Sequence, residues 1–98
     1  MNLTNKIEQW ATERGLHTAD PNKQMLKLIE EIGEIAEGLA KGKMGDVKDG
    51  IGDAHVVLTI LSMQLGLNIN DCIETAYNEI KDRKGEMVNG VFVKDSDL

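Results

Sequence analysis

Four glutamates lie close together in a part of the sequence that also carries a regular apolar pattern. At about 100° of rotation per helical residue, the apolar residues around them form one core-facing stripe. Glu31 borders this stripe about 60° from Glu34, so both carboxylates can point into the seam beside a neighbouring helix. Glu30 and Glu37 are typical of a solvated helix face. The stripe consists of Met25, Leu28, Ile29, Ile32, Ile35, Ala36 and Leu39.

A second group of acids follows further along the chain. Asp53 stands inside the apolar run from Ile51 to Leu65, where burying a carboxylate without a partner is strongly unfavourable. Asp46 and Asp49 share its side of a helix within about 60°. If this side packs against the seam glutamates, up to four carboxylates converge, and each would raise the pKa of the others unless a cation neutralised them.

Oxygen ligands without a Cys or a clustered His pair favour magnesium, manganese or calcium over zinc. The pattern therefore predicts a divalent-metal site between two acidic helices. The alternative is an ion pair between Asp53 and a Lys or Arg from another helix. Four glycines inside the predicted helices indicate close helix approach or room for a ligand beside the acids. They are Gly33, Gly38, Gly50 and Gly52.

The only dense cationic group closes the last predicted helix. It consists of Lys81, Arg83 and Lys84. Cations at a helix C-terminus complement the helix dipole without any further function, but they are also what a polyphosphate needs. Trp10 and Tyr77 are the aromatic residues of the helical part, and we interpret both as core residues, with stacking on a base as the alternative.

Composition limits the class of protein. The 98 residues suit one domain, which we place at 1–98. The net charge of −6 argues against binding a nucleic-acid backbone. Cys72 is the single cysteine, so we expect no disulfide, a small buried thiol and a reducing, cytoplasmic location. No apolar run reaches the length of about 18 residues that a membrane span needs, so no membrane partner is expected.

Start and stop signals predict four helices that position these residues. The first runs from 3 to 14, before Gly15, and the second from 21 to 40, after a capping Asp20. The predicted third helix is capped by Asp46 and ends before Gly66. The fourth is capped by Asn70 or Asp71 and terminated by Gly85.

We therefore predict an all-α fold, a four-helix bundle whose helical core spans about 3–85. The remainder, 86–98, is expected to be a short extended tail or a hairpin. Its Asn89-Gly90 pair is typical of a tight turn between two strands.

The two acidic groups together resemble a known family. Glu30-Glu31-Ile32-Gly33-Glu34, followed by Ile51-Gly52-Asp53 at the head of an apolar helix, resembles the EExxE…ExxD pattern of the MazG-like, all-α nucleoside triphosphate pyrophosphohydrolases. The opening around Trp10 and the ending from 77 to 85 are similar to small single-domain members, including ones carried by phages. The resemblance covers most of the chain.

Carried over residue by residue, the resemblance implies that Glu31, Glu34 and Asp53 coordinate Mg²⁺ or Mn²⁺. Glu34 and Glu30 are the implied catalytic acids. The second motif departs from the family, because its Glu should stand where Gly50 is found. Either Asp49, one turn before Asp53, reaches the same metal, or this ligand is missing.

The implied reaction is hydrolysis of a nucleoside triphosphate to a nucleoside monophosphate and pyrophosphate, as a homodimer or a tetramer made from dimers. The implied substrate-binding residues are Lys81, Arg83, Lys84, Asn78 and Trp10. The alternative is a non-catalytic module, either a helical sensor of nucleotide and metal or a dimeric protein-interaction module, and Gly50 is the residue that favours it.

Overall fold

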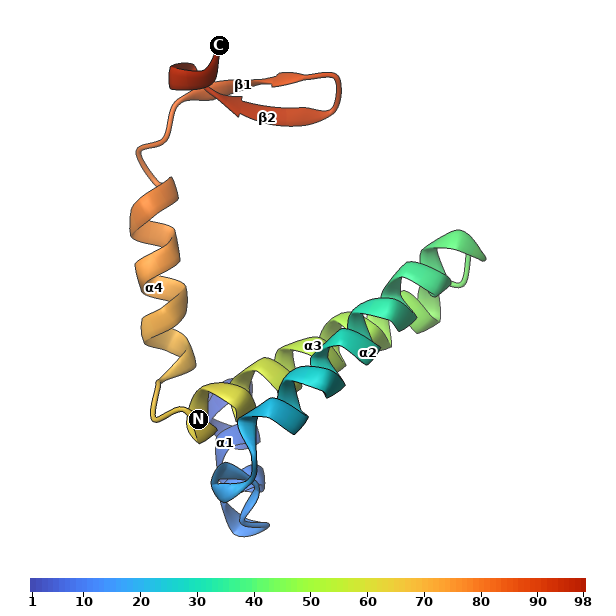
Figure 1. The fold of residues 1–98 in the computed structure, drawn as a ribbon, viewed down its shortest axis with the longest axis vertical. Coiled ribbons are helices and arrows are strands. Elements are labelled where there is room, and N and C mark those ends of the chain that lie inside the picture. The colour runs from blue at the N-terminus through green and yellow to red at the C-terminus, as the bar shows by residue number, and fades with distance from the viewer.

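The chain folds into four α-helices followed by a small hairpin, as a computed structural model of residues 1–98 shows (Figure 1). The all-α prediction with a C-terminal hairpin is confirmed. Short 3-10 turns lie at Leu16–Thr18 and Asp95–Asp97. The helices are α1 (Leu3–Glu13), α2 (Pro21–Ala40), α3 (Met44–Gln64) and α4 (Ile69–Ile80).

The ends of the first two helices follow from their capping residues. Gly15 takes the left-handed conformation, with φ of 69°, directly after α1 and its C-cap. The Asp20 side chain accepts a hydrogen bond from the backbone N–H of Asn22 at 2.9 Å, and Pro21 is the first residue of α2. The predicted ends of α2 are confirmed.

The predicted cap of α3 was wrong. Gly42, with φ of 67°, closes α2 and lets the N–H of Lys43 bond to the carbonyl of Gly38 at 2.8 Å. Because this turn is so short, α3 begins at Met44 and Asp46 lies inside its first turn. There its negative charge is favourable next to the helix dipole.

Both predicted ends of α4 were also wrong. Asn68 is the cap, and its side-chain oxygen accepts the N–H groups of Asn70 at 2.9 Å and Asp71 at 3.2 Å. The helix ends at Ile80, so the helical core stops before the expected limit of 85. Gly85 instead begins the first strand.

The C-terminal segment is a two-stranded antiparallel hairpin, β1 (Gly85–Val88) and β2 (Val91–Lys94). Val88 pairs with Val91 across the turn. Asn89 and Gly90 both have positive φ, 51° and 81°, as a type I′ turn requires. The hairpin alternative for the tail is confirmed.

The arrangement of the helices differs from a closed four-helix bundle. α2 and α3 form an antiparallel pair, α1 packs against α3, and α4 projects away with the hairpin at its far end (Figure 1). The side chain of Gln24 ties α2 to α3 by donating to the carbonyl of Val57 at 3.2 Å. Gly66, with φ of 72°, follows α3, and α4 is bent by 106° from it. Within one chain, therefore, three helices pack together, whereas the fourth buries only its first residue, Ile69.

The core is smaller than the apolar stripe on α2 predicts. Of that stripe only Leu28 is buried, whereas most of its members are exposed because a single helix, α3, covers α2. Cys72 and Trp10 are exposed as well, contrary to expectation, and Arg14 lies over the Trp10 ring at 4.4 Å. The buried hydrophobic residues are Ala11, Leu28, Val47, Val57, Ile60 and Ile69.

Taken singly, none of the helices has both the length and the apolar character of a membrane span. The sharply bent pair of α3 and α4 meets these two criteria only when both helices are counted together.

Candidate functional site

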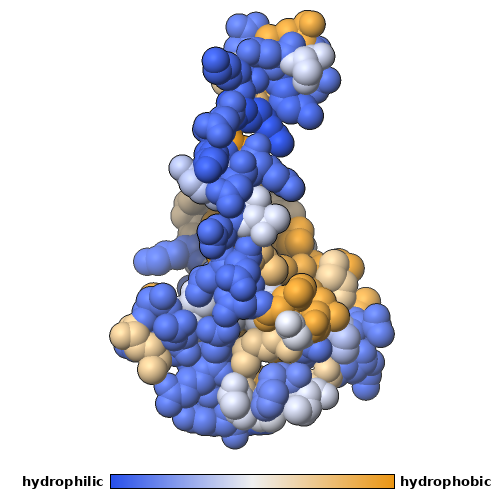
Figure 2. Space-filling model, turned by 90° about the vertical axis from the view of Figure 1, so that its left-hand side faces the viewer, coloured by the Kyte–Doolittle hydropathy of each residue, from blue (hydrophilic) through white to orange (hydrophobic).

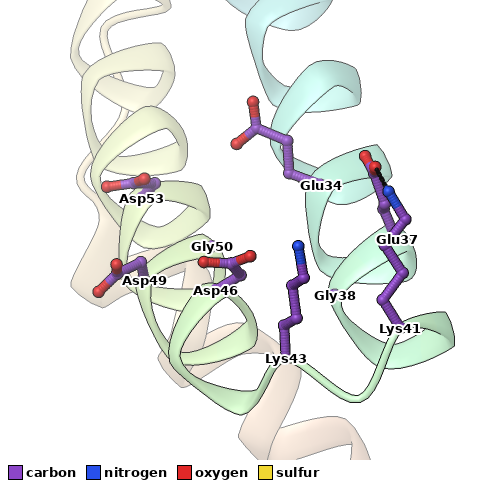
Figure 3. A pocket seen from close by; sticks show the side chains of 9 residues that line it. All are labelled: Glu34, Glu37, Gly38, Lys41, Lys43, Asp46, Asp49, Gly50 and Asp53. Atoms are coloured by element: carbon purple, nitrogen blue, oxygen red, sulfur yellow. Dashed lines mark hydrogen bonds and ion pairs between the residues drawn. The ribbon is translucent and has the colours of Figure 1, made fainter.

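A polar cleft of about 340 Å³ opens between α2 and α3 at the end of the pair where the two helices are joined (Figure 3). Its size is at the lower end of the range for small-molecule sites. None of the residues that line it is hydrophobic. They are Glu34, Glu37, Gly38, Lys41, Lys43, Asp46, Asp49, Gly50 and Asp53.

Two glycines bring the walls of the cleft together. A Cβ on Gly38 would lie 3.0 Å from Cγ2 of Val47, and a Cβ on Gly50 would lie 2.6 Å from Cγ1 of Ile35. No other residue type fits these positions without movement of a neighbour. The prediction of close helix approach is therefore confirmed for these two glycines. Gly33 has open space around it instead.

The structure brings together one predicted acid of the first motif and two of the second. Glu34 reaches from α2 towards α3, while Asp49 and Asp53 lie on the α3 wall (Figure 3). Asp46, one turn before Asp49, adds a further carboxylate from the same wall. The cleft is thus formed by acids that are distant in sequence and adjacent in space.

Glu31 does not line this cleft and is half-buried. Its Oε2 atom is buried and has no hydrogen-bond partner. Burial raises the pKa of Glu31 above its ordinary value of 4.5, and the negative charges of Glu34 and Asp53 raise it further, while Lys27 opposes them. An unpartnered carboxylate oxygen in such surroundings is a vacant position for a proton or a cation.

Other predicted residues do not line the cleft. Glu30 is exposed, outside the lining. Trp10 lines a separate apolar groove between α1 and α3, together with Ile51 and Val56. The four predicted substrate-binding residues near the C-terminus lie on α4 and the loop that follows it. They are Asn78, Lys81, Arg83 and Lys84.

Two lysines in the cleft were missed at the level of sequence. Lys41 is paired with Glu37, one turn before it. Lys43 makes no ion pair, and its ammonium group extends into the cleft (Figure 3). The available signal was their position in the short connection between the two motifs. An antiparallel helix pair necessarily places that connection at the end of the cleft.

Comparison with known proteins decides the family. Residues 19–88, which include α2, α3 and α4, match the MazG nucleotide pyrophosphohydrolase domain. This chain belongs to that family. A MazG-family relationship is consistent with both acidic motifs, because each contributes a wall of the cleft.

A phage protein is also similar to this MazG-family chain. It is described as an uncharacterized 18.2 kDa protein in the rep-hol intergenic region of Haemophilus phage HP1 (strain HP1c1). The two are 49% identical over 63 residues, which is 63% of this chain and 39% of that protein. The chain therefore aligns with well under half of the relative's length. No solved structure matches the chain significantly.

The cleft of this MazG domain has the donor chemistry for a hard divalent cation. Its lining carries five carboxylates and two ammonium groups, and Glu31 adds its unpartnered oxygen. Oxygen donors of this kind suit Mg²⁺ or Mn²⁺. As placed here, no three acidic, histidine or cysteine side chains are arranged to hold one ion, so binding requires side-chain rotation.

Proposed function

We propose that this MazG-family protein hydrolyses nucleoside or deoxynucleoside triphosphates to the monophosphate and pyrophosphate, with Mg²⁺ or Mn²⁺ as cofactor. The observation that carries the proposal is the acidic cleft between α2 and α3, which combines Glu34 of the first motif with Asp49 and Asp53 of the second. The family supports the reaction type.

The charge of the cleft supports the cation requirement. Its carboxylates outnumber its ammonium groups by five to two, so a triphosphate entering alone would be repelled. Glu31, Glu34, Asp49 and Asp53 are the residues that would hold the cation. A bound divalent cation would neutralise phosphate oxygens and make an attacking water more acidic.

The chain's own residues then have separate tasks. The oxygen of water forms a bond to the phosphorus nearest the sugar, and the bond from that phosphorus to the bridging oxygen breaks, so that pyrophosphate leaves. Glu34, which reaches across the cleft, accepts the proton of the water. Lys43 holds the outer phosphates, because it is the cleft cation that has no carboxylate partner.

One observation favours a second function. The side of α3 where the family motif has a Glu is occupied by Gly50, and Ile35 fills the space beside it. If Asp49 does not replace that ligand, the protein would bind nucleotide and cation without turnover, as a sensor. This alternative makes the same binding prediction and the opposite prediction for hydrolysis.

Purified protein incubated with the common ribo- and deoxyribonucleoside triphosphates, with and without Mg²⁺, provides the test. We expect equimolar monophosphate and pyrophosphate, no orthophosphate, and no product after chelation of the cation. Glu8→Gln is a matched control, because Glu8 is a partly exposed carboxylate on α1 outside the cleft. Nucleotide binding by calorimetry without hydrolysis of any triphosphate would reject the enzyme and support the sensor.

We further propose a cytoplasmic, homo-oligomeric protein. The single Cys72 fits a reducing compartment. The substrate-binding roles of Lys81, Arg83 and Lys84 stay predictions. They require that α4 approach the cleft of another copy, because the cleft of the same chain is lined without them.

A further inference from the structure

The exposed apolar surface of the chain is unevenly distributed. It gathers on one flank of the helical body, whereas the near side of α4 is hydrophilic (Figure 2). Part of the exposed apolar surface lines the groove between α1 and α3, which has a volume of about 840 Å³. This volume is within the range of small-molecule sites. The family match begins at residue 19, so it does not include α1, which forms one wall of the groove.

Two contacts hold the walls of the apolar groove in place. α1 packs against α3 and buries Ala11 completely. Towards the other end of α1, Thr4 Oγ1 and His55 Nε2 are 3.3 Å apart in a hydrogen bond. Trp10 and Ile51 nevertheless stay 46% and 59% exposed on the two walls. The groove is therefore preformed and open, as ligand sites usually are.

Gly52 forms an open part of the α3 wall. A glycine inside a helix is unfavourable relative to alanine. Close helix packing accounts for Gly38 and Gly50, whereas an added Cβ on Gly52 would have nothing within 4 Å. Gly52 thus leaves the backbone of α3 accessible on the wall opposite the one that carries Trp10. A flat helix surface across from an indole ring fits a planar aromatic group.

Lys6 gives this groove its charge. It stands one turn before Trp10 on α1 and makes no ion pair within the chain. Five of the eight residues that line the groove are hydrophobic and none is acidic, although the whole chain has a net charge of −6. The groove therefore presents an unpaired cation next to apolar surface, which is complementary to an anion with an apolar body.

We propose that the apolar groove binds a small planar aromatic anion, with its ring between Trp10 and Gly52 and its negative group paired with Lys6. Contact with the indole adds to the burial of ring surface, and the charge-assisted contact with Lys6 fixes the orientation of the ligand. A nucleobase fits less well, because its polar edges would exchange water for a mostly hydrophobic lining.

The apolar groove and the acidic cleft open on different sides of α3. Ile51 and His55 of the groove are each about 160° around the helix from Asp53 of the cleft. Binding in the groove is therefore separate from hydrolysis. It is measured without nucleotide and in the presence of a chelator.

Trp10 is the single tryptophan of the chain, so its indole N–H gives one nuclear magnetic resonance signal that reports on the groove. Naphthoate, a planar two-ring carboxylate, should shift this signal of the full chain saturably, with a Kd on the order of 1 mM or tighter. Naphthamide, its neutral counterpart, should bind about 5-fold more weakly because it does not pair with Lys6.

Lys6→Gln tests the charged contact. This variant should bind naphthoate about 5-fold more weakly than wild type and naphthamide equally well, because only the carboxylate interacts with the ammonium group. Lys23→Gln is the matched control, since Lys23 is an exposed lysine of α2 outside the groove. It should bind both compounds as wild type does.

Gly52→Leu tests the place of the ring. Its side chain should fill the groove and abolish the shift of the Trp10 signal, without a clash at its Cβ. Gly33→Leu is the matched control, because an added Cβ there also has nothing within 4 Å but Gly33 lies outside the groove. If circular dichroism shows that Gly52→Leu does not fold, the two ligands on wild type and Lys6→Gln still test the proposal.

Four outcomes would overturn the inference. One is the absence of a saturable shift of the Trp10 signal at millimolar naphthoate, and another is equal affinity for naphthoate and naphthamide. Displacement of naphthoate by a nucleoside monophosphate would assign the groove to the substrate instead. A Trp10 signal that changes with the concentration of the chain and not with naphthoate would show that a second copy covers the groove.

Discussion

Gly50 lies directly against Ile35. A Cβ on Gly50 would be 2.6 Å from Cγ1 of Ile35, a separation at which one of the two atoms must move. The place where the family's second motif has a Glu is therefore a helix contact in this chain. The absent side chain brings α2 and α3 close together and leaves Asp46, Asp49 and Asp53 as the acids on that wall of the cleft.

This contact predicts that Gly50→Ala is destabilising even though Ala is the better helix former. The gain in helix propensity is about 1 kcal/mol, but overpacking costs about 1–3 kcal/mol, and the branched Ile35 has little freedom to rotate away. We expect a net loss of about 1 kcal/mol in chemical denaturation. Gly33→Ala is the control, because nothing lies within 4 Å of its added Cβ, and it should be neutral or stabilising.

Asp49→Asn tests whether Asp49 replaces the missing Glu. The substitution keeps the shape of the side chain and removes the charge, so loss of a cation ligand should reduce kcat/KM by about 10- to 100-fold. It should also raise the Mg²⁺ concentration for half-maximal activity. Wild-type rates for Asp49→Asn would refute the replacement and show that the remaining acids suffice.

Most of the helical architecture is predictable from the sequence because it depends on local signals. The Asp20 cap, the Gly15 and Gly66 terminators and the Asn89-Gly90 turn each act through neighbouring backbone groups. The wrong predictions of helix caps also came from local signals. Asn68 competes with two equally good capping residues close by, and only its hydrogen bonds distinguish it.

The residues of the candidate site were predictable where helical periodicity determines their position. They were not predictable where the packing of one helix against another determines it. Helical spacing predicts the sides of the two helices that carry Glu34 and Asp53, and the structure places both acids in one cleft. Burial of the α2 stripe was wrong because periodicity identifies an apolar side without saying which helix covers it. Lys43 was missed for a related reason, since its place in the cleft depends on how tightly the turn closes.

Glu34→Gln should separate the two predicted catalytic acids. Because Glu34 lines the cleft and Glu30 does not, Glu34→Gln should lower kcat by at least about 100-fold, while Glu30→Gln should stay within a few-fold of wild type. Without cation, Glu34→Gln should unfold at the same or a higher temperature, since one of several crowded negative charges is removed. A marked loss of stability without cation would instead indicate a structural ion pair.

The raised pKa of Glu31 predicts a pH-dependent stability without cation. The folded state holds the proton of Glu31 more tightly than the unfolded state, so this group stabilises most below its ordinary value of 4.5. That contribution is lost as pH rises through the raised folded value. Unfolding temperatures in chelator from pH 4.5 to 7.5 should therefore show wild type falling relative to Glu31→Gln. A constant difference between the two would contradict the prediction.

Lys43→Gln tests how the outer phosphates are held. Lys43 is the lysine of the cleft without a carboxylate partner, whereas Lys41 is already paired with Glu37. A charge-assisted contact to phosphate contributes about 1.5–3 kcal/mol, so Lys43→Gln should raise KM for a triphosphate by about 10- to 100-fold, and Lys41→Gln much less.

The same assay applied to Lys81→Gln shows whether the phosphates are held by Lys43 of the cleft alone or also by Lys81 of α4. If Lys43 alone holds the phosphates, Lys81→Gln should have wild-type kinetics, since Lys81 lies at the end of α4 and outside the cleft. If Lys81→Gln also raises KM, the end of α4 reaches a cleft. Mixing Lys81→Gln with inactive Glu34→Gln then decides between copies, because mixed oligomers would recover a functional cleft only if the lysine is supplied by the partner.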